Sequence, residues 1–129
     1  AMIREHQELG QRLFWLSGVS DEFLQKIYDA SDCLIAASHH EGFGLPLIEA
    51  AKLGLPIIAR DIPVFREVAS TYADYFPDQH DPESMAMAIR RWIDLHAQNA
   101  HPASEAMPWL TWQQSVEQIV AALQRSAAH

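Results

Sequence analysis

The sequence predicts an α/β fold in which a parallel β-sheet is covered by helices on both faces. Two observations support this prediction. Short apolar runs, each of the length of a buried strand, alternate along the chain with stretches whose apolar residues recur at helical spacing. Several helical stretches begin with a side chain that caps helices, or with a proline that suits the first turn. Strands that alternate with helices usually form right-handed crossovers, and such strands lie parallel in one sheet.

Four apolar runs bounded by turn residues predict the strands. They cover residues 13–16, 33–37 and 56–59, with a shorter candidate at 75–76. Cys33 opens the second run. Because it is a lone cysteine inside an apolar segment, we expect a buried core thiol rather than a nucleophile or a disulfide partner.

Five stretches predict helices, over residues 20–31, 46–53, 64–69, 81–96 and 111–124. Ser20, Asp81 and Thr111 suit N-cap positions because their side-chain oxygens can accept a free backbone N–H. Pro46 suits a first turn, and Gly54 suits the position just after a helix end. The apolar residues expected to face inward are Phe23, Leu24, Ile27 and Tyr28 on the first helix, Met85, Ala88, Ile89, Trp92, Ile93 and His96 on the fourth, and Val116, Ile119, Val120 and Leu123 on the last.

Size and composition indicate one domain over residues 1–129. The chain has 129 residues, of which 49% are hydrophobic and 20% are charged, as is typical of a soluble globular protein. The net charge of −8, without a cluster of Lys and Arg, argues against nucleic acid as a partner. No apolar run approaches the ~20 residues of a membrane span and no signal peptide is visible, so we expect a cytoplasmic protein.

The loop at residues 38–45 is the strongest candidate for a functional site. It connects a predicted buried strand to a predicted helix, and ligands of parallel sheets bind at the carboxyl ends of strands. Gly42 and Gly44 allow positive φ and close approach of a ligand, while free N–H groups at the helix start favour an anion. Glu41 and Glu49 flank the loop, where they would repel a phosphate but could hold hydroxyl groups. A ligand with both a phosphate and a hydroxyl-rich part, such as a nucleotide sugar, fits this description.

Glu41 and Glu49, separated by seven residues within Glu-Gly-Phe-Gly-Leu-Pro-Leu-Ile-Glu-Ala, resemble the paired-glutamate motif of glycosyltransferase family 4. These are retaining transferases of the two-domain GT-B fold. Further matches extend the resemblance over about residues 9–123; they lie at residues 14–20, 28–32, 54–59, 61–68, 81–83 and 110–112. The resemblance implies a Rossmann-like sheet of about four strands, forming part of the C-terminal donor-binding domain.

The resemblance also implies roles for individual residues. Glu49 would bind the ribose hydroxyls of a UDP- or GDP-sugar, as the substrate-binding carboxylate. Glu41, the expected catalytic residue, would accept hydrogen bonds from the donor sugar and stabilise positive charge at its anomeric carbon. The backbone N–H groups expected to hold the sugar and diphosphate are those of Gly42, Phe43, Gly44 and Leu45. No cofactor and no metal are expected, and the products would enter polysaccharide or glycolipid biosynthesis.

One departure from the family lies before the matched region. Family members carry two further strands there, with an Arg and a Lys for the diphosphate, and a separate N-terminal acceptor domain. None of the nine Lys and Arg residues of this chain matches those positions. We therefore expect a domain truncated at its N-terminal side, inactive or nearly so by itself, with any membrane contact made only through the acceptor domain. An unpaired apolar strand invites association, so we expect segments that re-pair, or a homodimer.

Other interpretations remain open from the residues alone. Glu41 could be a solvated loop acid and Glu49 an ordinary surface residue. His39 and His40 precede Glu41 and suggest metal ligands, but neighbours in an extended segment point to opposite sides. The chain could instead be a non-catalytic module that binds nucleotide sugar or needs a separate acceptor subunit. A nicotinamide-binding domain is disfavoured because the Gly-rich fingerprint after a first strand is lacking.

Overall fold

The computed structural model describes residues 3–108 and 112–127. The chain falls into two compact units, Ala1–Ala30 and Ser31–His129. The candidate site lies wholly in the second unit.

The first unit contains one helix, α1 (Asp21–Ala30). The Ser20 hydroxyl oxygen accepts the Phe23 N–H at 3.1 Å, which confirms the predicted N-cap. Phe23 and Leu24 are exposed, however, and no residue of α1 is buried. The apolar face predicted from the helical spacing therefore exists, but the described residues of the first unit do not bury it.

The strand predicted at residues 13–16 is not formed. Leu13 makes only an isolated bridge to Leu9, and Phe14, Trp15 and Leu16 are each more than half exposed. A strand needs a partner for its backbone groups, and among the described residues of the first unit nothing extends that bridge into a ladder. The prediction of about four strands is therefore wrong, because the strand expected at residues 13–16 is absent.

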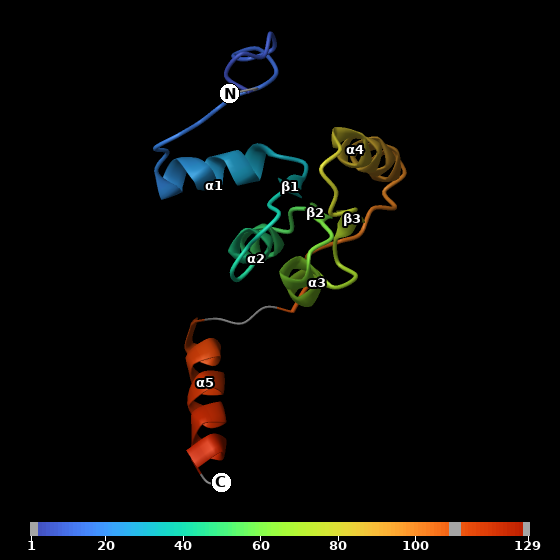
Figure 1. Ribbon diagram of the computed structural model, residues 1–129. Helices are drawn as coiled ribbons and strands as arrows, with labels where there is room; N and C mark the ends of the chain where they lie inside the picture. Colours follow the sequence, from blue (N-terminus) through green and yellow to red (C-terminus); the bar gives the residue numbers. More distant parts are fainter. Residues whose placement is uncertain (1–2, 109–111, 128–129) are drawn as a thin grey trace. The chain divides into compact units, whose positions relative to one another are not determined.

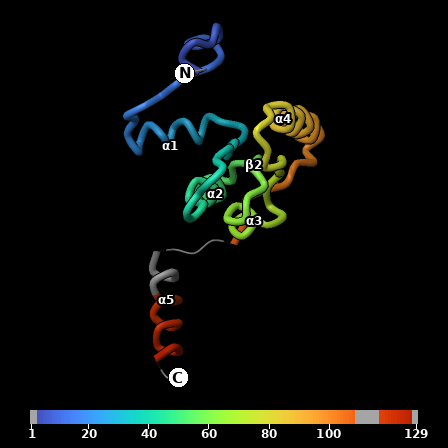
Figure 2. The backbone as a smooth tube through the Cα atoms, in the orientation of Figure 1, coloured from blue at the N-terminus to red at the C-terminus, as the bar shows by residue number. Residues whose placement is uncertain are grey.

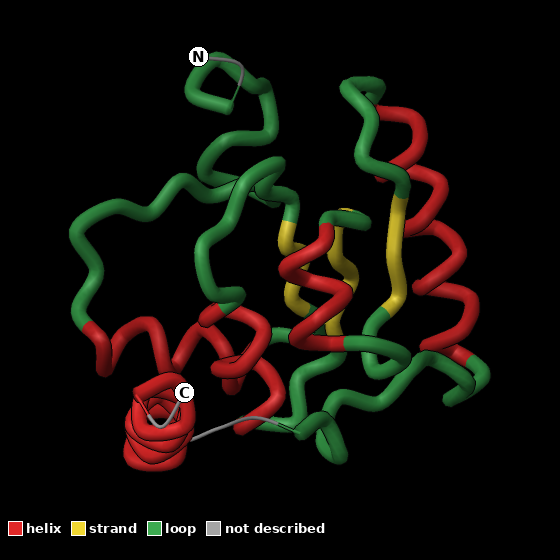
Figure 3. Tube along the Cα trace, turned by 60° about the horizontal axis from the view of Figure 1, so that its bottom comes forward, coloured by secondary structure: helices red, strands yellow, loops and turns green. Residues whose placement is uncertain are grey.

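The second unit contains a parallel sheet of three strands, β1 (Leu34–Ala36), β2 (Ile57–Arg60) and β3 (Asp74–Phe76), in the order β1-β2-β3. Figure 3 shows these strands side by side in yellow. The three other predicted strands are thus confirmed, with bounds shifted by a residue or two. Their carboxyl ends share one edge of the sheet.

Helices flank this sheet on both faces, as predicted. Helices α2 (Leu45–Lys52) and α3 (Pro63–Ala69) lie on one side of it, and α4 (Pro82–Ala97) lies on the other (Figure 1). Strands and helices alternate along the chain from β1 to α4, and the colour gradient of Figure 2 shows the path of the chain through them. This arrangement is a Rossmann-like α/β fold.

Packing on the two faces follows the alternation of side chains along β2, whose four residues are all buried. Ile58 joins Phe76, Ala88 and Trp92 in a cluster under α4, with Cys33, Met85 and Ile89 packed against it. Ile57 and Ala59 point to the opposite face, where α2 and α3 supply buried Leu47 and Phe65. The sheet is therefore held from both sides.

Two expectations about inward-facing residues are wrong. On α4, Ile93 and His96 are exposed because the helix turns Ala88 and Trp92 toward the sheet. On the last helix, α5 (Trp112–Ala127), Ile119, Val120 and Leu123 are exposed. Thr111, the predicted cap of that helix, and the side chain of Val116 lie outside the described residues.

Candidate functional site

The loop between β1 and α2 ends in a left-handed residue. Gly44 has φ 67° and ψ 28° and forms the N-cap of α2, with Leu45 as its first residue and proline in the first turn. Within residues 3–108 and 112–127, no group accepts a hydrogen bond from the N–H of Phe43, Gly44 or Leu45. Three donors therefore remain available at the positive end of the helix dipole, an arrangement suited to an anion.

The two glycines of this loop differ in backbone conformation and in the space around them. A Cβ on Gly44 would lie 3.0 Å from Val68 Cγ2 of α3, in addition to the strain of positive φ. Gly42 does not have positive φ, and a Cβ there would meet nothing within 4 Å. Only Gly44 therefore meets the expectation of a glycine required by the backbone.

The two glutamates of the motif lie at either end of this turn. Glu41 is half-buried, and its Oε1 accepts the Gly42 N–H at 3.1 Å. Glu49 lies on α2, one turn after Leu45, and is exposed. Phe43, between them, is 76% exposed. The N–H of Gly42 is thus occupied by Glu41, whereas the following N–H groups are not.

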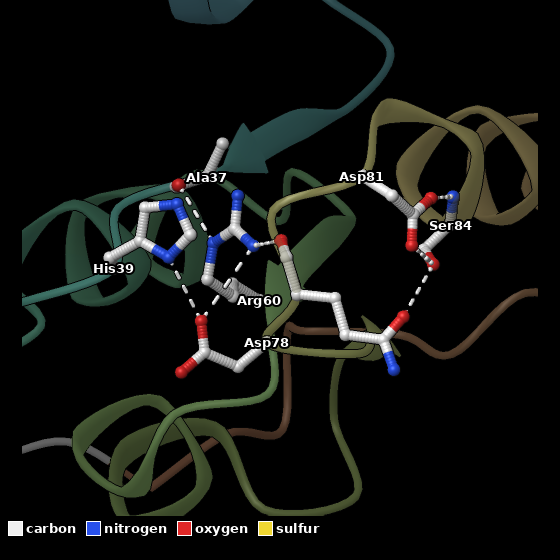
Figure 4. Close-up of polar contacts among 7 residues, drawn as sticks. Ala37, His39, Arg60, Asp78, Asp81 and Ser84 are labelled. Atoms are coloured by element: carbon white, nitrogen blue, oxygen red, sulfur yellow. Dashed lines mark hydrogen bonds and ion pairs between the residues drawn. The ribbon is translucent and has the colours of Figure 1, made fainter.

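Arg60, at the carboxyl end of β2, contributes a buried cation that sequence reasoning did not single out. It is only 8% exposed. Its Nε donates to the Ala37 carbonyl oxygen at 3.0 Å and its Nη1 donates to the Gln79 carbonyl oxygen at 2.8 Å (Figure 4). The guanidinium also lies 5.0 Å from the Phe76 ring centroid. The sequence feature that could have identified it is an arginine directly after an apolar run that predicts a buried strand.

A second polar contact joins the loops after β1 and β3. His39 Nδ1 and Asp78 Oδ1 are 2.9 Å apart, and Asp78 Oδ1 also lies 3.7 Å from Arg60 Nη1 (Figure 4). The His39 ring stacks on that of His80, with centroids 4.6 Å apart. His39 therefore contacts the loop that follows β3. Among the described residues, no group of three or more His, Cys, Asp or Glu side chains could hold a metal ion.

The loop after β3 is anchored at its far end by the start of α4. Asp81 is the predicted N-cap, and its Oδ1 accepts the Ser84 N–H at 2.8 Å. This hydrogen bond lowers the pKa of Asp81 below its ordinary value, since it stabilises the charged carboxylate. The Ser84 hydroxyl donates in turn to the Gln79 side chain at 3.1 Å. The carboxyl edge of the sheet is thus cross-linked from β1 to α4.

A sequence model described as "Glycosyl transferases group 1" matches residues 3–107. The chain belongs to the group 1 glycosyltransferases. The match includes the whole β1–α2 loop and all three strands. The resemblance read from Glu41 and Glu49 is therefore confirmed at the level of this family.

Individual relatives are glycosyltransferases as well. The chain is 54% identical over 115 residues to the serotype-specific mannosyltransferase WbdA of Escherichia coli, covering 89% of this chain and 14% of the relative. It is 40% identical over 84 residues to the O-antigen chain mannosyltransferase RfbU of Salmonella typhimurium (64% and 23%). It is 29% identical over 131 residues to the D-inositol 3-phosphate glycosyltransferase of Mycolicibacterium smegmatis (97% and 30%).

The chain spans less than a third of the length of each of these relatives. Among the helices that the structure describes, none is long and apolar enough to cross a membrane.

Proposed function

We propose that this chain is the nucleotide-sugar-binding part of a retaining glycosyltransferase of family 4, from the C-terminal domain of a GT-B fold. The observation that carries the proposal is the turn at Gly44, where free N–H groups begin a helix that bears Glu49 and follows Glu41. Donors for an anion and carboxylates for hydroxyls thus occupy one short segment at the carboxyl end of β1. A nucleotide sugar requires both.

In this proposal the diphosphate lies at the N-terminus of α2, where the N–H groups of Phe43, Gly44 and Leu45 donate to its oxygens. Glu49 accepts hydrogen bonds from the ribose hydroxyls, and Glu41 accepts them from the sugar. As the bond between the anomeric carbon and the leaving phosphate oxygen breaks, the electron pair stays with the diphosphate. The Glu41 carboxylate then stabilises the positive charge that develops on the sugar.

The donor sugar that we favour is mannose. Two of the relatives described above bear the name mannosyltransferase. Their names also refer to serotype and to the O-antigen chain, so we propose a role in bacterial surface polysaccharide assembly, on the cytoplasmic side. The acceptor would be held by a domain outside this sequence.

The test is calorimetric titration of this chain with GDP-mannose and UDP-glucose, repeated with Glu49→Ala. We expect the wild-type chain to bind one of them and Glu49→Ala to weaken that binding about 10- to 100-fold, because charge-assisted hydrogen bonds to the ribose are lost. Glu22→Ala is the matched control, since Glu22 is an exposed helical glutamate of α1. Absence of binding by the wild-type chain, or an equal effect of both variants, would contradict the proposal.

A second expectation concerns turnover. If the acceptor is bound elsewhere, this chain should bind the donor without transferring its sugar. The measurement is release of nucleoside diphosphate in the presence of candidate acceptors. Efficient transfer by the 129-residue chain alone would show that the acceptor site lies within it.

A further inference from the structure

We propose that Arg60 is a positioning residue for Glu41. By binding the loops that follow β1 and β3, Arg60 would fix where Glu41 meets the donor sugar. The inference rests on the proposed function, because it assigns a task to a residue that does not itself touch the donor. We use the name strand-end clamp for Arg60, its partners Ala37, Asp78 and Gln79, and His39, which contacts Asp78.

Arg60 links the loop after β1 to the loop after β3. Its planar guanidinium donates through Nε to one loop, at Ala37, and through Nη1 to the other, at Gln79. Lysine carries a single nitrogen and cannot reproduce two donors in this fixed fork. Because the side chain is 92% covered and packs on the Phe76 ring, it has little freedom to turn. The two loops are therefore held at a set separation across the end of β2.

The strand-end clamp contacts the loop that contains Glu41 at two points. Ala37 lies four residues before Glu41, and its carbonyl oxygen is bound by Arg60. His39 lies two residues before Glu41 and is bound to Asp78, which also approaches Arg60. On the other side of Glu41, Gly44 is buried in a left-handed conformation, and Val68 of α3 lies close to where a Cβ would be. Glu41 thus sits in a short segment that is restrained at both ends.

The ribose-binding end of the proposed site does not depend on the clamp in this way. Glu49 belongs to α2, whose position is set by buried Leu47, Ala50 and Ala51. A weakened clamp should therefore disturb contacts with the sugar and leave contacts with the nucleoside in place. Weaker binding of the sugar with unchanged binding of the nucleoside would therefore distinguish a positioning role from a general loss of structure.

The experiment compares the affinities of this chain for GDP-mannose and for GDP. In Arg60→Lys we expect GDP-mannose to bind about tenfold more weakly and GDP to bind within about twofold of the wild type, because only the Glu41 contact is lost. In a Glu41→Gln background, Arg60→Lys should have almost no further effect on either ligand, since both changes remove one interaction. Equal losses for both ligands, or fully additive losses, would overturn the inference.

The matched control is Arg91→Lys. Arg91 also binds a carboxylate and a backbone carbonyl, those of Asp74 and Tyr75, but at the start of β3. This variant should leave the ratio of the two affinities unchanged. Asp78→Asn serves as a milder second variant if Arg60→Lys unfolds, because Asp78 is partly exposed and contacts both His39 and Arg60. It should shift the ratio in the same direction, and an unchanged ratio would count against the clamp.

Amide hydrogen exchange of the free chain tests the clamp without any ligand. Arg60→Lys should speed exchange at residues 38–44 and leave α4 unchanged. Unchanged exchange there would refute the clamp whatever the chain binds. Faster exchange in a chain that binds no nucleotide sugar would refute the proposed function instead.

Discussion

At the scale of single residues, the structure places Cys33 at the edge of the core, half-buried, so the predicted burial of this thiol is met only in part. Its Sγ donates to the Leu34 carbonyl oxygen at 3.4 Å, and it packs against the cluster under α4. Burial is the main cause that raises the pKa of Cys33 from 9.0 to about 12. The thiol therefore keeps its proton in the folded state over a range in which an unfolded thiol loses it.

We expect Cys33 to react with iodoacetamide at pH 9 far more slowly in the folded chain than in denaturant, because the thiolate is the reactive form. Stability should also fall as the pH rises from 9 toward 12, since the unfolded state releases its proton first. Mass spectrometry of the alkylated chain measures the first effect and thermal melts measure the second. Rapid alkylation of the folded chain would contradict this account.

The contacts of Arg60 could not be predicted from the sequence. An arginine after an apolar run is visible in the sequence, but its partners come from two separate segments, the loops after β1 and β3, which meet it only at the carboxyl edge of the sheet. Glu41 and Glu49 could be proposed as site residues because their spacing lies within one segment. A motif that is local in sequence can be read directly, whereas a contact across strands requires the fold.

At the scale of elements, the strands and helices from β1 to α4 were predictable because each carries its own pattern and punctuation. Asp81 and Gly54 mark helix ends that the structure confirms, and the helix predicted over residues 64–69 begins one residue earlier, at Pro63. Residues 13–16 have the same apolar pattern and still form no strand, because the pattern does not supply a pairing partner. An apolar run alone therefore establishes neither pairing nor burial, since Phe14, Trp15 and Leu16 are each more than half exposed.

The turn into α2 gives a prediction at this scale. Gly44→Ala should destabilise the chain by about 1–2 kcal/mol, because a left-handed residue with a Cβ is strained and that Cβ would meet Val68. Gly42→Ala is the matched control in the same loop and should change stability by less than about 0.5 kcal/mol. Urea titrations of both variants provide the comparison. A tolerated Gly44→Ala would mean that this turn does not require the left-handed conformation.

At the scale of the whole molecule, β1 forms one edge of the described sheet, and Ile35 on it is 43% exposed. Such an edge offers unpaired backbone groups to another strand. We propose that in solution a second copy of the chain covers it, as the sequence suggested.

Sedimentation velocity tests this association. The wild-type chain should show a monomer–dimer equilibrium in the micromolar range, and Ile35→Lys should shift it toward monomer because a buried charge would be left unpaired. Ile93→Lys is the control, since Ile93 is equally apolar and exposed but lies on α4. A wild-type chain that stays monomeric throughout would contradict the proposed dimer.

The central claim is that the turn from Glu41 to Glu49 binds a nucleotide sugar, and amide chemical shifts measured by NMR during titration with GDP-mannose test it most directly. The account predicts the largest shift changes at the N–H groups of Phe43, Gly44 and Leu45, with smaller ones at Glu41 and along α2. It also predicts that GDP alone perturbs α2 but leaves Glu41 nearly unchanged. Shift changes confined to other parts of the chain, or none at saturating donor, would contradict it.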